Sequence, residues 1–463
     1  MAARRRGWAC WSRATVHGPR TVRCSRTPAP PLRPCRRRGG RTGGRRRRRP
    51  SCSTYTHHPR SCVSCHEQVR PSRPRDLVGA GWFDGPVEKV TWNQVLARRL
   101  RRLHVTDPSP DLVGTAGRLV GLHAQVASSA ELIAGVRTPS YRLGDTATAL
   151  WTDRTLVKTW GMRGTLHLFP SRELPLLVAA WAQRQWPNVN AAWERYHGVN
   201  LAVLRQVTEI IGEVLPGKVL TREELLTEIA REVRAPGIVD AVRSGWGQMF
   251  KPAAAGGLLC SGPERDRNVT FTSPRTWLPD VSWDDRPDEH TALSMLIERF
   301  LDIYGPATHI DFSRWWGIDA AKARRVFKEH AEVMVEAEVD GVACWSTPAV
   351  LAELTDGGNG DDVTGVHLLP GFDPYVIAPI GHRVHTVPDG FIDRVSRAAG
   401  WISPVLLVDG VIRGVWSHEL KNGALTLTVE PFAKVGAATK KAAAAAARRY
   451  GELFDAEPRL TWG

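Results

Sequence analysis

The stretch that decides the fold covers residues 311–346 and reads DFSRWWGIDAAKARRVFKEHAEVMVEAEVDGVACWS. Its first half predicts a short helix at 311–318, a turn, and a second helix at 319–330 that is rich in basic residues. Residues 333–346 then read as two strands joined at Asp340-Gly341, a dipeptide typical of a two-residue hairpin turn. A helix, a turn, a basic helix and a hairpin together make the plan of a winged helix-turn-helix.

A similar order of elements occurs at the start of the folded region. Residues 93–105 and 111–123 have the apolar spacing of helices, and Asp111 is placed to cap the second of them. Residues 155–169 alternate in polarity and predict a strand pair with one apolar face.

A second unit of this kind lies between the two. Residues 201–215 and 221–233 have helical spacing, and Thr221 with Glu224 forms a capping-box signature. Two short strands follow within residues 256–272, around a basic tip.

We therefore predict an α+β protein with three tandem winged helix-turn-helix units and a β-rich C-terminal segment, preceded by a disordered tail. In the last segment, strand-like runs meet at Asp409-Gly410 and an Ala-rich helix follows at 438–450. The predicted ranges are 1–85 for the tail, 86–172, 173–290 and 291–350 for the three units, and 363–463 for the C-terminal segment.

Residues 1–75 explain the net charge of +16, because their arginines outweigh a single acid, Glu67, whereas the rest of the chain is slightly acidic. The Arg, Pro, Gly and Ser content of the tail predicts disorder, and it lacks the apolar region of a secretory signal. The motif CVSCH at 62–66 has the spacing of c-type haem attachment and, with Cys52, His57 and His58, could offer zinc ligands. A transit peptide remains an alternative. Another is a native start near Val87 or Val90, with the tail not part of the working protein.

The rest of the composition restricts the class of protein. Only Cys260 and Cys344 lie beyond the tail, which favours a reducing compartment, the cytoplasm. No apolar run is long enough to span a membrane, so we expect no membrane partner. We expect no metal cluster in the folded region, no cofactor and a monomer.

The segment GLHAQ, residues 121–125, is the candidate catalytic stretch. Ser128 with Glu131 gives a further capping-box signature, so residues 123–127 are expected to connect two helices. In an extended connector, His123 and Gln125 share one side. The alternative is structural: a core histidine that satisfies a backbone group, and a glutamine that caps a helix end.

GLHAQ resembles the AlkZ- and YcaQ-like bacterial DNA glycosylases when it is taken together with four further motifs, over roughly residues 88–463. These motifs are WGMRGTLHLF (160–169), YGPA (304–307), LLPGFDP (368–374) and LLVDGVIRGVW (406–416). The resemblance implies tandem winged helices, excision of N7-alkylated purines and unhooking of interstrand crosslinks. The family motif, Gln-x-Gln or Gln-x-Asp, falls on His123-Ala124-Gln125, so this chain departs from both forms at its first position.

The expected chemistry is hydrolysis of a glycosidic bond. An N7-alkylpurine is cationic and leaves without protonation, so the enzyme mainly holds a water and stabilises an oxocarbenium-like sugar. Gln125 would orient the water through its carbonyl oxygen, and His123 would accept a proton near neutral pH. The motif contains no lysine, so no Schiff base is expected.

The expected partner is double-stranded DNA, damaged or crosslinked. Arg163 and His167, on the polar face of the first strand pair, are candidates for contact with the backbone or the lesion, unless Arg163 pairs with Asp145 or Asp153. The candidate phosphate contacts are Arg265, Arg267, Lys322, Arg325 and Lys328.

Two other classes of function fit the same pattern. One is a DNA-binding or regulatory protein without catalysis, and the other is a winged-helix scaffold for protein partners. Basic helix faces are often merely solvated, and winged helices also bind proteins.

Overall fold

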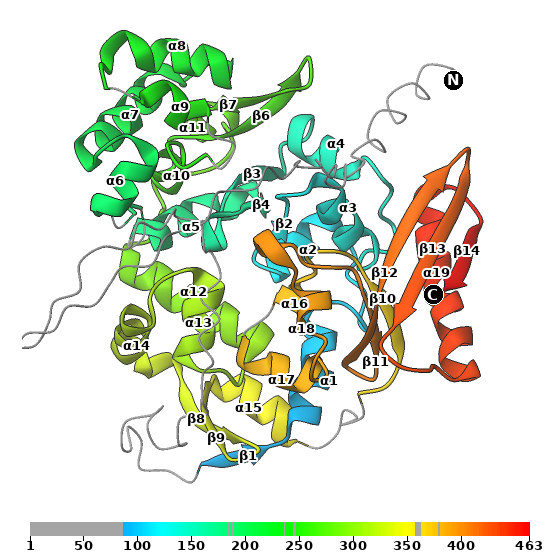
Figure 1. The fold of residues 1–463 in the computed structure, drawn as a ribbon. Coiled ribbons are helices and arrows are strands. Elements are labelled where there is room, and N and C mark those ends of the chain that lie inside the picture. Colours follow the sequence, from blue (N-terminus) through cyan, green and yellow to red (C-terminus); the bar gives the residue numbers. More distant parts are fainter. Residues whose placement is uncertain are drawn as a thin grey trace, which may run out of the picture. The chain divides into compact units, whose positions relative to one another are not determined.

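The computed structural model describes residues 87–463, apart from 183–184, 188, 236, 244–246, 357–362 and 378–379. The predicted tail at 1–85, with its CVSCH motif, lies outside the described residues. The described part mixes helices with four β-sheets, three of three strands and one of five (Figure 1). The predicted α+β class is confirmed.

The first unit combines short helices with a three-stranded sheet. Asp111 accepts a hydrogen bond from the Gly114 amide at 2.7 Å, so the predicted N-cap is confirmed. The strand order in the sheet is β2-β4-β3. The elements are β1 (Glu88–Val90), α1 (Trp92–Arg102), α2 (Leu112–Arg118), β2 (Leu122–His123), α3 (Ala127–Gly135), α4 (Asp145–Trp151), β3 (Leu156–Trp160), η3 (Met162–Gly164), β4 (Leu166–Pro170), η4 (Ser171–Glu173) and α5 (Leu174–Trp181).

The second unit repeats the pattern of helices followed by a hairpin. The predicted capping box is confirmed, because the Thr221 hydroxyl accepts from the Glu224 amide and the Glu224 carboxylate accepts from the Thr221 amide. The elements are α6 (Ala191–His197), α7 (Leu201–Val214), β5 (Val219–Thr221), α8 (Arg222–Glu232), α9 (Ile238–Arg243), α10 (Lys251–Ala255), β6 (Cys260–Arg265), β7 (Asn268–Thr272) and α11 (Pro274–Trp277).

The third unit contains the stretch quoted at the outset. The hairpin turns at Asp340 and Gly341, both with positive φ (46° and 83°), as the sequence predicts. The elements are α12 (Glu289–Tyr304), α13 (His309–Trp316), α14 (Ala320–Glu329), η6 (Ala331–Val333), β8 (Val335–Val339), β9 (Val342–Ser346) and α15 (Pro348–Thr355).

Strand β1 and helix α1 belong to the third unit rather than to the first. β1 pairs in parallel with β8, and Val90 lies opposite Val339. Arg98 of α1 is 1% exposed and pairs with Asp302 of α12 and Glu353 of α15. The predicted range 86–172 is therefore not self-contained, because its first helix packs on elements found about 200 residues later.

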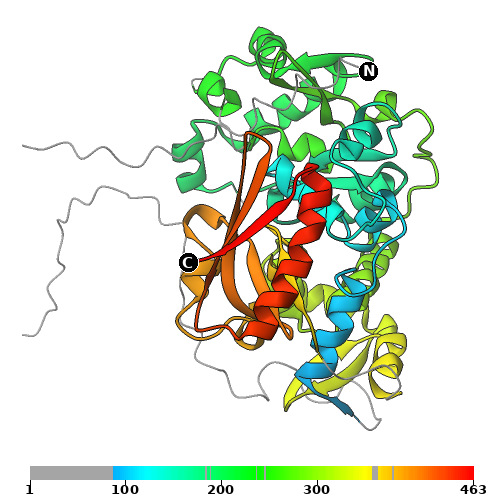
Figure 2. The same ribbon diagram turned by 90° about the vertical axis from the view of Figure 1, so that its right-hand side faces the viewer.

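The C-terminal segment forms a five-stranded sheet in the order β10-β11-β12-β13-β14, covered by helix α19 (Figure 2). The predicted turn at Asp409-Gly410 joins β11 to β12. Arg449 of α19 donates to the Gly135 carbonyl, which ties this helix to the first unit. The elements are β10 (Val366–Leu369), α16 (Pro374–Ile377), η7 (Ile380–His382), α17 (Arg383–Thr386), α18 (Ile392–Val395), η8 (Ala398–Gly400), β11 (Val405–Val408), β12 (Val411–Lys421), β13 (Ala424–Pro431), α19 (Ala437–Phe454) and β14 (Pro458–Trp462).

The buried apolar residues show which parts fold together. One large cluster joins the first unit, the third unit and the C-terminal sheet, with members such as Leu122, Phe300 and Leu407. The second unit has its own cluster, built around residues such as Leu204 and Phe271. The first sheet thus lies within a core shared with the C-terminal segment, and this shared core positions the candidate site.

Candidate active site

The helix that precedes the His-Ala-Gln segment is shorter than the sequence predicts. α2 ends at Arg118, and Val120 (φ 51°) and Gly121 (φ 100°) then reverse the chain. A Cβ at Gly121 would lie 2.5 Å from the Phe169 ring, so only glycine fits this turn. The prediction of a helix over residues 111–123 is wrong at its C-terminal end, because His123 lies in β2.

The segment after His123 is a connector, as predicted, but the predicted capping box is wrong. α3 is capped by Val126 with no side-chain hydrogen bond. Glu131 instead accepts a hydrogen bond from the Thr146 hydroxyl at 3.0 Å. The Glu131 carboxylate, which the local sequence pattern assigned to the helix cap, therefore bonds to a residue of another helix.

His123 is held by sheet pairing and by aromatic contacts. It lies opposite His167 of β4, and the two rings meet edge to face at 5.3 Å. The Phe372 ring stacks on the other side of His123 at 4.7 Å and an interplanar angle of 5°. His123 is 6% exposed, and its buried Nδ1 atom has no hydrogen-bond partner among the described residues.

Burial determines the charge of His123. Desolvation, and secondarily the Arg163 guanidinium, lower the pKa of His123 to about 3. The imidazole is therefore neutral at neutral pH. The expectation from the sequence that His123 accepts a proton near neutral pH assumes an exposed imidazole with an ordinary pKa.

Gln125 lies at the solvent-exposed edge of the same connector. The Ala124 amide donates to the Leu166 carbonyl at 2.7 Å, so the chain stays extended beyond β2. The side-chain oxygen of Gln125, Oε1, accepts from the Leu166 amide at 3.2 Å. His123 and Gln125 thus both contact β4, one buried and one exposed.

Arg163 is half-buried against α13 rather than free on an outer polar face. It occupies the turn between β3 and β4 with φ 55°, and its guanidinium donates to the Trp315 carbonyl of α13 at 3.0 Å. Burial lowers the pKa of Arg163 to about 10. Within the described residues it forms no ion pair with Asp145 or Asp153. His167 is 1% exposed, so this face of the strand pair is not a free surface.

Phe372 and Trp401 complete this cluster, although sequence reasoning gave them no role. Phe372 has φ 60° and precedes Asp373, which forms a fully buried ion pair with Arg137. Trp401 meets the Phe372 ring at 5.1 Å and is 44% exposed. The motif LLPGFDP, which contains Phe372, could have indicated this contact, because it was one of the family-like motifs to which no function was assigned.

The predicted phosphate contacts occupy two separate elements. Arg265 and Arg267 lie at the β6–β7 turn, where Asp266 and Arg267 both have positive φ, and Arg265 pairs with Glu224. On α14, Arg325 and Lys328 are exposed and Lys322 is half-buried. Among the described residues, no hydrogen bond or ion pair joins the β6–β7 turn or α14 directly to His123.

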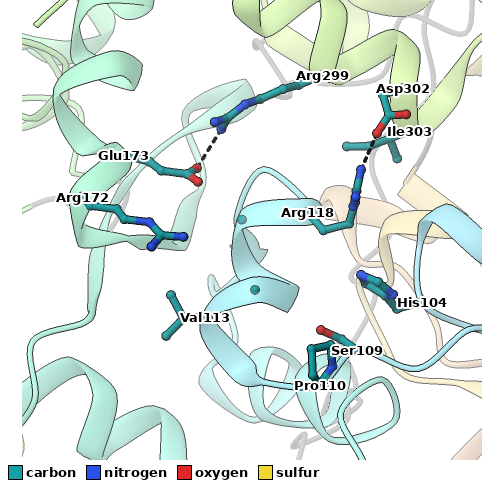
Figure 3. A pocket seen from close by; sticks show the side chains of 12 residues that line it. His104, Ser109, Pro110, Val113, Arg118, Arg172, Glu173, Arg299, Asp302 and Ile303 are labelled. Carbon is teal, nitrogen blue, oxygen red and sulfur yellow. Dashed lines mark hydrogen bonds and ion pairs between the residues drawn. The ribbon is translucent and has the colours of Figure 1, made fainter. Parts of the chain in front are cut away.

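A polar groove of about 420 Å³ lies beside α2, η4 and α12 (Figure 3). Glu173 pairs with Arg299 at 2.7 Å, and Asp302 pairs with Arg118. Neither His123 nor Gln125 lines it, and its carboxylates are neutralised by arginines. We therefore assign the chemistry to the His123 cluster rather than to this groove.

The structure brings together three potential metal ligands that the sequence did not single out. His290, His330 and Glu332 lie close together in the third unit. His290 precedes His330 by 40 residues in sequence, so no local spacing signals the cluster.

Across the described residues, the helices are all too short or too polar to cross a membrane.

Comparisons with known proteins complete the description of the site. A family model described as DNA glycosylase AlkZ-like matches residues 116–453. The interstrand DNA cross-link repair glycosylase of Streptomyces sahachiroi is 36% identical over 352 residues, which is 74% of this chain and 91% of that protein. The solved structure of Streptomyces sahachiroi DNA glycosylase AlkZ superimposes with a TM-score of 0.72 and 33% identity, covering 81% of this chain and 99% of that one.

Proposed function

The chain belongs to the AlkZ-like family of DNA glycosylases, and we propose that it hydrolyses the N-glycosidic bond of N7-alkylated purines in duplex DNA. The observation that carries the proposal is the geometry of residues 123–125. The connector is extended, His123 is held between His167 and Phe372, and Gln125 lies at the exposed edge.

The proposed reaction needs little acid catalysis. The C1′–N9 bond breaks, its electron pair neutralises the cationic purine, and an oxocarbenium-like sugar remains. A water then forms the new C1′–O bond. Gln125 would bind that water or the sugar with its exposed side chain, whose Oε1 atom also accepts a hydrogen bond from the Leu166 amide.

A neutral His123 suits this reaction. The water that has attacked C1′ becomes a protonated alcohol, which is a strong acid. Even an imidazole with a pKa of about 3 can accept its proton and pass it to solvent. A neutral ring also avoids placing a second positive charge beside the developing cation.

The nucleophile in this proposal is water rather than an amine. The motif His123-Ala124-Gln125 contains no lysine, so the enzyme is monofunctional and leaves an abasic site without strand cleavage.

We extend the proposal to interstrand crosslinks, because the Streptomyces sahachiroi relative is named for their repair. Hydrolysis of one of the two joined nucleotides would release one strand from the other. Trp401, exposed beside Phe372, offers an aromatic face on which an extruded base can stack.

For DNA binding, we propose that the three units within 86–172, 173–290 and 291–350, with β1 and α1 packed on the third, act as tandem winged helices followed by the β-rich segment 363–463. Each has helices before a hairpin, and α14 carries exposed Arg325 and Lys328 as a recognition helix would. Arg265 and Arg267 would contact phosphates from the β6–β7 turn. The proposed enzyme acts as a cytoplasmic monomer.

The test is release of N7-methylguanine from methylated duplex DNA. Gln125→Ala should lower the release rate by about 100-fold, the scale of a positioned catalytic group, while DNA affinity stays within a factor of about two. The matched control is Gln206→Ala, on the exposed side of α7, which should release base at the wild-type rate.

Two outcomes would replace the proposal. Equal binding to methylated and unmethylated DNA without base release would indicate a non-catalytic DNA-binding or regulatory protein. Absent or salt-insensitive DNA binding would indicate a scaffold for protein partners.

A further inference from the structure

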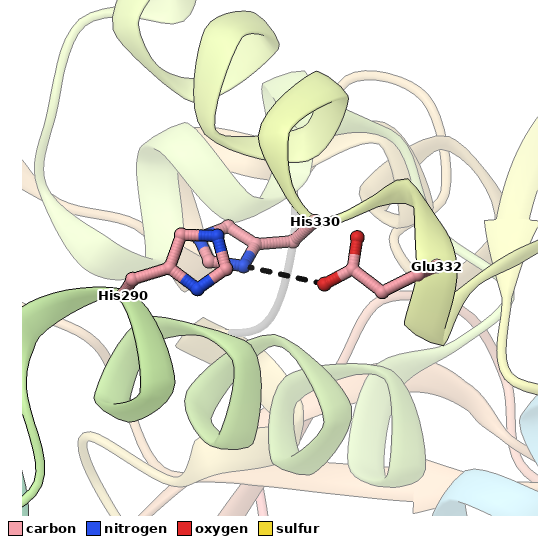
Figure 4. Close-up of side chains that lie close together, drawn as sticks. All are labelled: His290, His330 and Glu332. Carbon is pink, nitrogen blue, oxygen red and sulfur yellow. Dashed lines mark ion pairs between the residues drawn. The ribbon is translucent and has the colours of Figure 1, made fainter.

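Three side chains converge where the start of α12 meets the end of α14 (Figure 4). His290 lies in the first turn of α12, His330 is the C-cap of α14, and Glu332 follows in η6. One potential ligand atom from each lies within 4.8 Å of the other two. The imidazole centroids are 4.1 Å apart, and Nδ1 of His330 is 3.9 Å from Oε1 of Glu332.

His330 is the fixed member of this cluster. It is 1% exposed, and its Nδ1 atom has no hydrogen-bond partner in the part of the chain that the structure describes. Its amide donates to the Val326 carbonyl, and its carbonyl accepts from the Val333 amide, so its backbone is held at the helix end. Burying a nitrogen atom without a hydrogen-bond partner costs free energy of folding. This nitrogen lies close to the side chains of His290 and Glu332, which can bind the same metal ions.

The position of His330 at the end of a helix also favours a bound cation. The C-terminal end of α14 carries partial negative charge from its backbone carbonyl groups, and a positive ion beside it is stabilised.

We propose that His290, His330 and Glu332 form a binding site for a divalent transition-metal ion such as Zn²⁺. Two imidazole nitrogens and one carboxylate oxygen are a set that zinc accepts, with water as the fourth ligand. Tetrahedral coordination needs ligand atoms about 3.4 Å apart, at bond lengths of about 2.1 Å. The exposed side chains of His290 and Glu332 can close on the fixed His330.

The bound ion would tie α12 to α14. The helix α14 carries Lys322, Arg325 and Lys328, so the site would fix the orientation of the basic face without touching His123 or Gln125. Its role is structural, and it acts independently of the proposed chemistry.

The experiment is a zinc titration of the full chain, followed by calorimetry and thermal unfolding. His290→Ala and Glu332→Gln remove one ligand each from exposed positions, and Glu298→Gln, also exposed on α12, is the matched control. Any zinc bound by the N-terminal cysteines is common to all four proteins and cancels in the comparison.

We expect the wild type and Glu298→Gln to bind one more zinc ion than His290→Ala does. Saturating zinc should raise their Tm by about 2–4 °C more than it raises that of His290→Ala or Glu332→Gln. Replacing Zn²⁺ with Co²⁺ should give the visible bands of a tetrahedral ion, and these should be lost in His290→Ala.

Equal stoichiometry and equal Tm response in all four proteins would overturn the proposal. Because both altered side chains are exposed, their zinc-free Tm should match that of the wild type, which separates loss of metal from loss of fold.

Discussion

At the residue scale, His123 combines a position matched to the family motif with an unusual environment. It is enclosed by His167 and Phe372, and its Nδ1 atom has no hydrogen-bond partner among the described residues. A buried imidazole with a lowered pKa is neutral near pH 7, so it can form hydrogen bonds but does not hold an extra proton. The first motif position can therefore be occupied by histidine or glutamine without a change of charge.

That environment predicts how stability depends on pH. The pKa of His123 is lowered to about 3 in the folded protein, against about 6.5 in an unfolded chain. Between these values the unfolded chain binds a proton that the folded chain does not, so stability falls as pH decreases below about 6.5. In His123→Gln this contribution is absent.

Urea unfolding at pH 7.5 and pH 5 measures the effect. The wild type should lose about 2 kcal/mol more on acidification than His123→Gln, since one pKa unit corresponds to about 1.4 kcal/mol. Equal losses in the two proteins would mean that His123 is solvated or charged in the fold.

At the element scale, several predictions rest on local signals and are confirmed. The hairpin at Asp340-Gly341, the N-cap Asp111 and the capping box of Thr221 with Glu224 all need only residues within one turn of each other. Such contacts are decided by backbone geometry that neighbouring residues control.

The predictions that differ depended on distant partners. Ser128 and Glu131 match the capping signature as well as Thr221 and Glu224 do, but Thr146 binds the Glu131 carboxylate instead. The pairing of β1 with β8 and the stacking of Phe372 on His123 join residues far apart in sequence. Local patterns cannot report these contacts.

The basic helix α14 gives a prediction about DNA binding. Arg325→Glu combined with Lys328→Glu should weaken binding to duplex DNA and make the slope of log K against log salt shallower by about two units. The matched control is Lys441→Glu on the exposed side of α19, which changes charge on an element that we assign no DNA contact.

Fluorescence anisotropy at several salt concentrations measures both quantities. An unchanged slope in the double variant would remove α14 from the DNA-binding surface.

At the scale of the whole molecule, strand β1 and helix α1 pack against the third unit. Trp92 is 8% exposed and contacts the rings of His382 and His385, and Val90 pairs with β8. The first helix of the described chain therefore contributes to a core formed mainly by later residues, including Val339 and Val350.

Replacing this tryptophan should be costly. Trp92→Ala should lower the free energy of unfolding by about 3–5 kcal/mol, as expected for a buried aromatic side chain. Trp401→Ala, at a position that is 44% exposed, should cost less than about 1.5 kcal/mol and serves as the matched control. Chemical denaturation compares the two, and similar losses would contradict the role assigned to α1.

The stacking of Phe372 on His123 has a consequence for synthesis of the protein. The ribosome completes His123 about 250 residues before Phe372, and domains generally fold as units as the chain emerges. Until Phe372 and Asp373 have emerged and Asp373 has paired with Arg137, the histidine has no wall to stack on. A prematurely terminated chain could therefore carry all its helix-and-hairpin units and still lack a formed catalytic pocket.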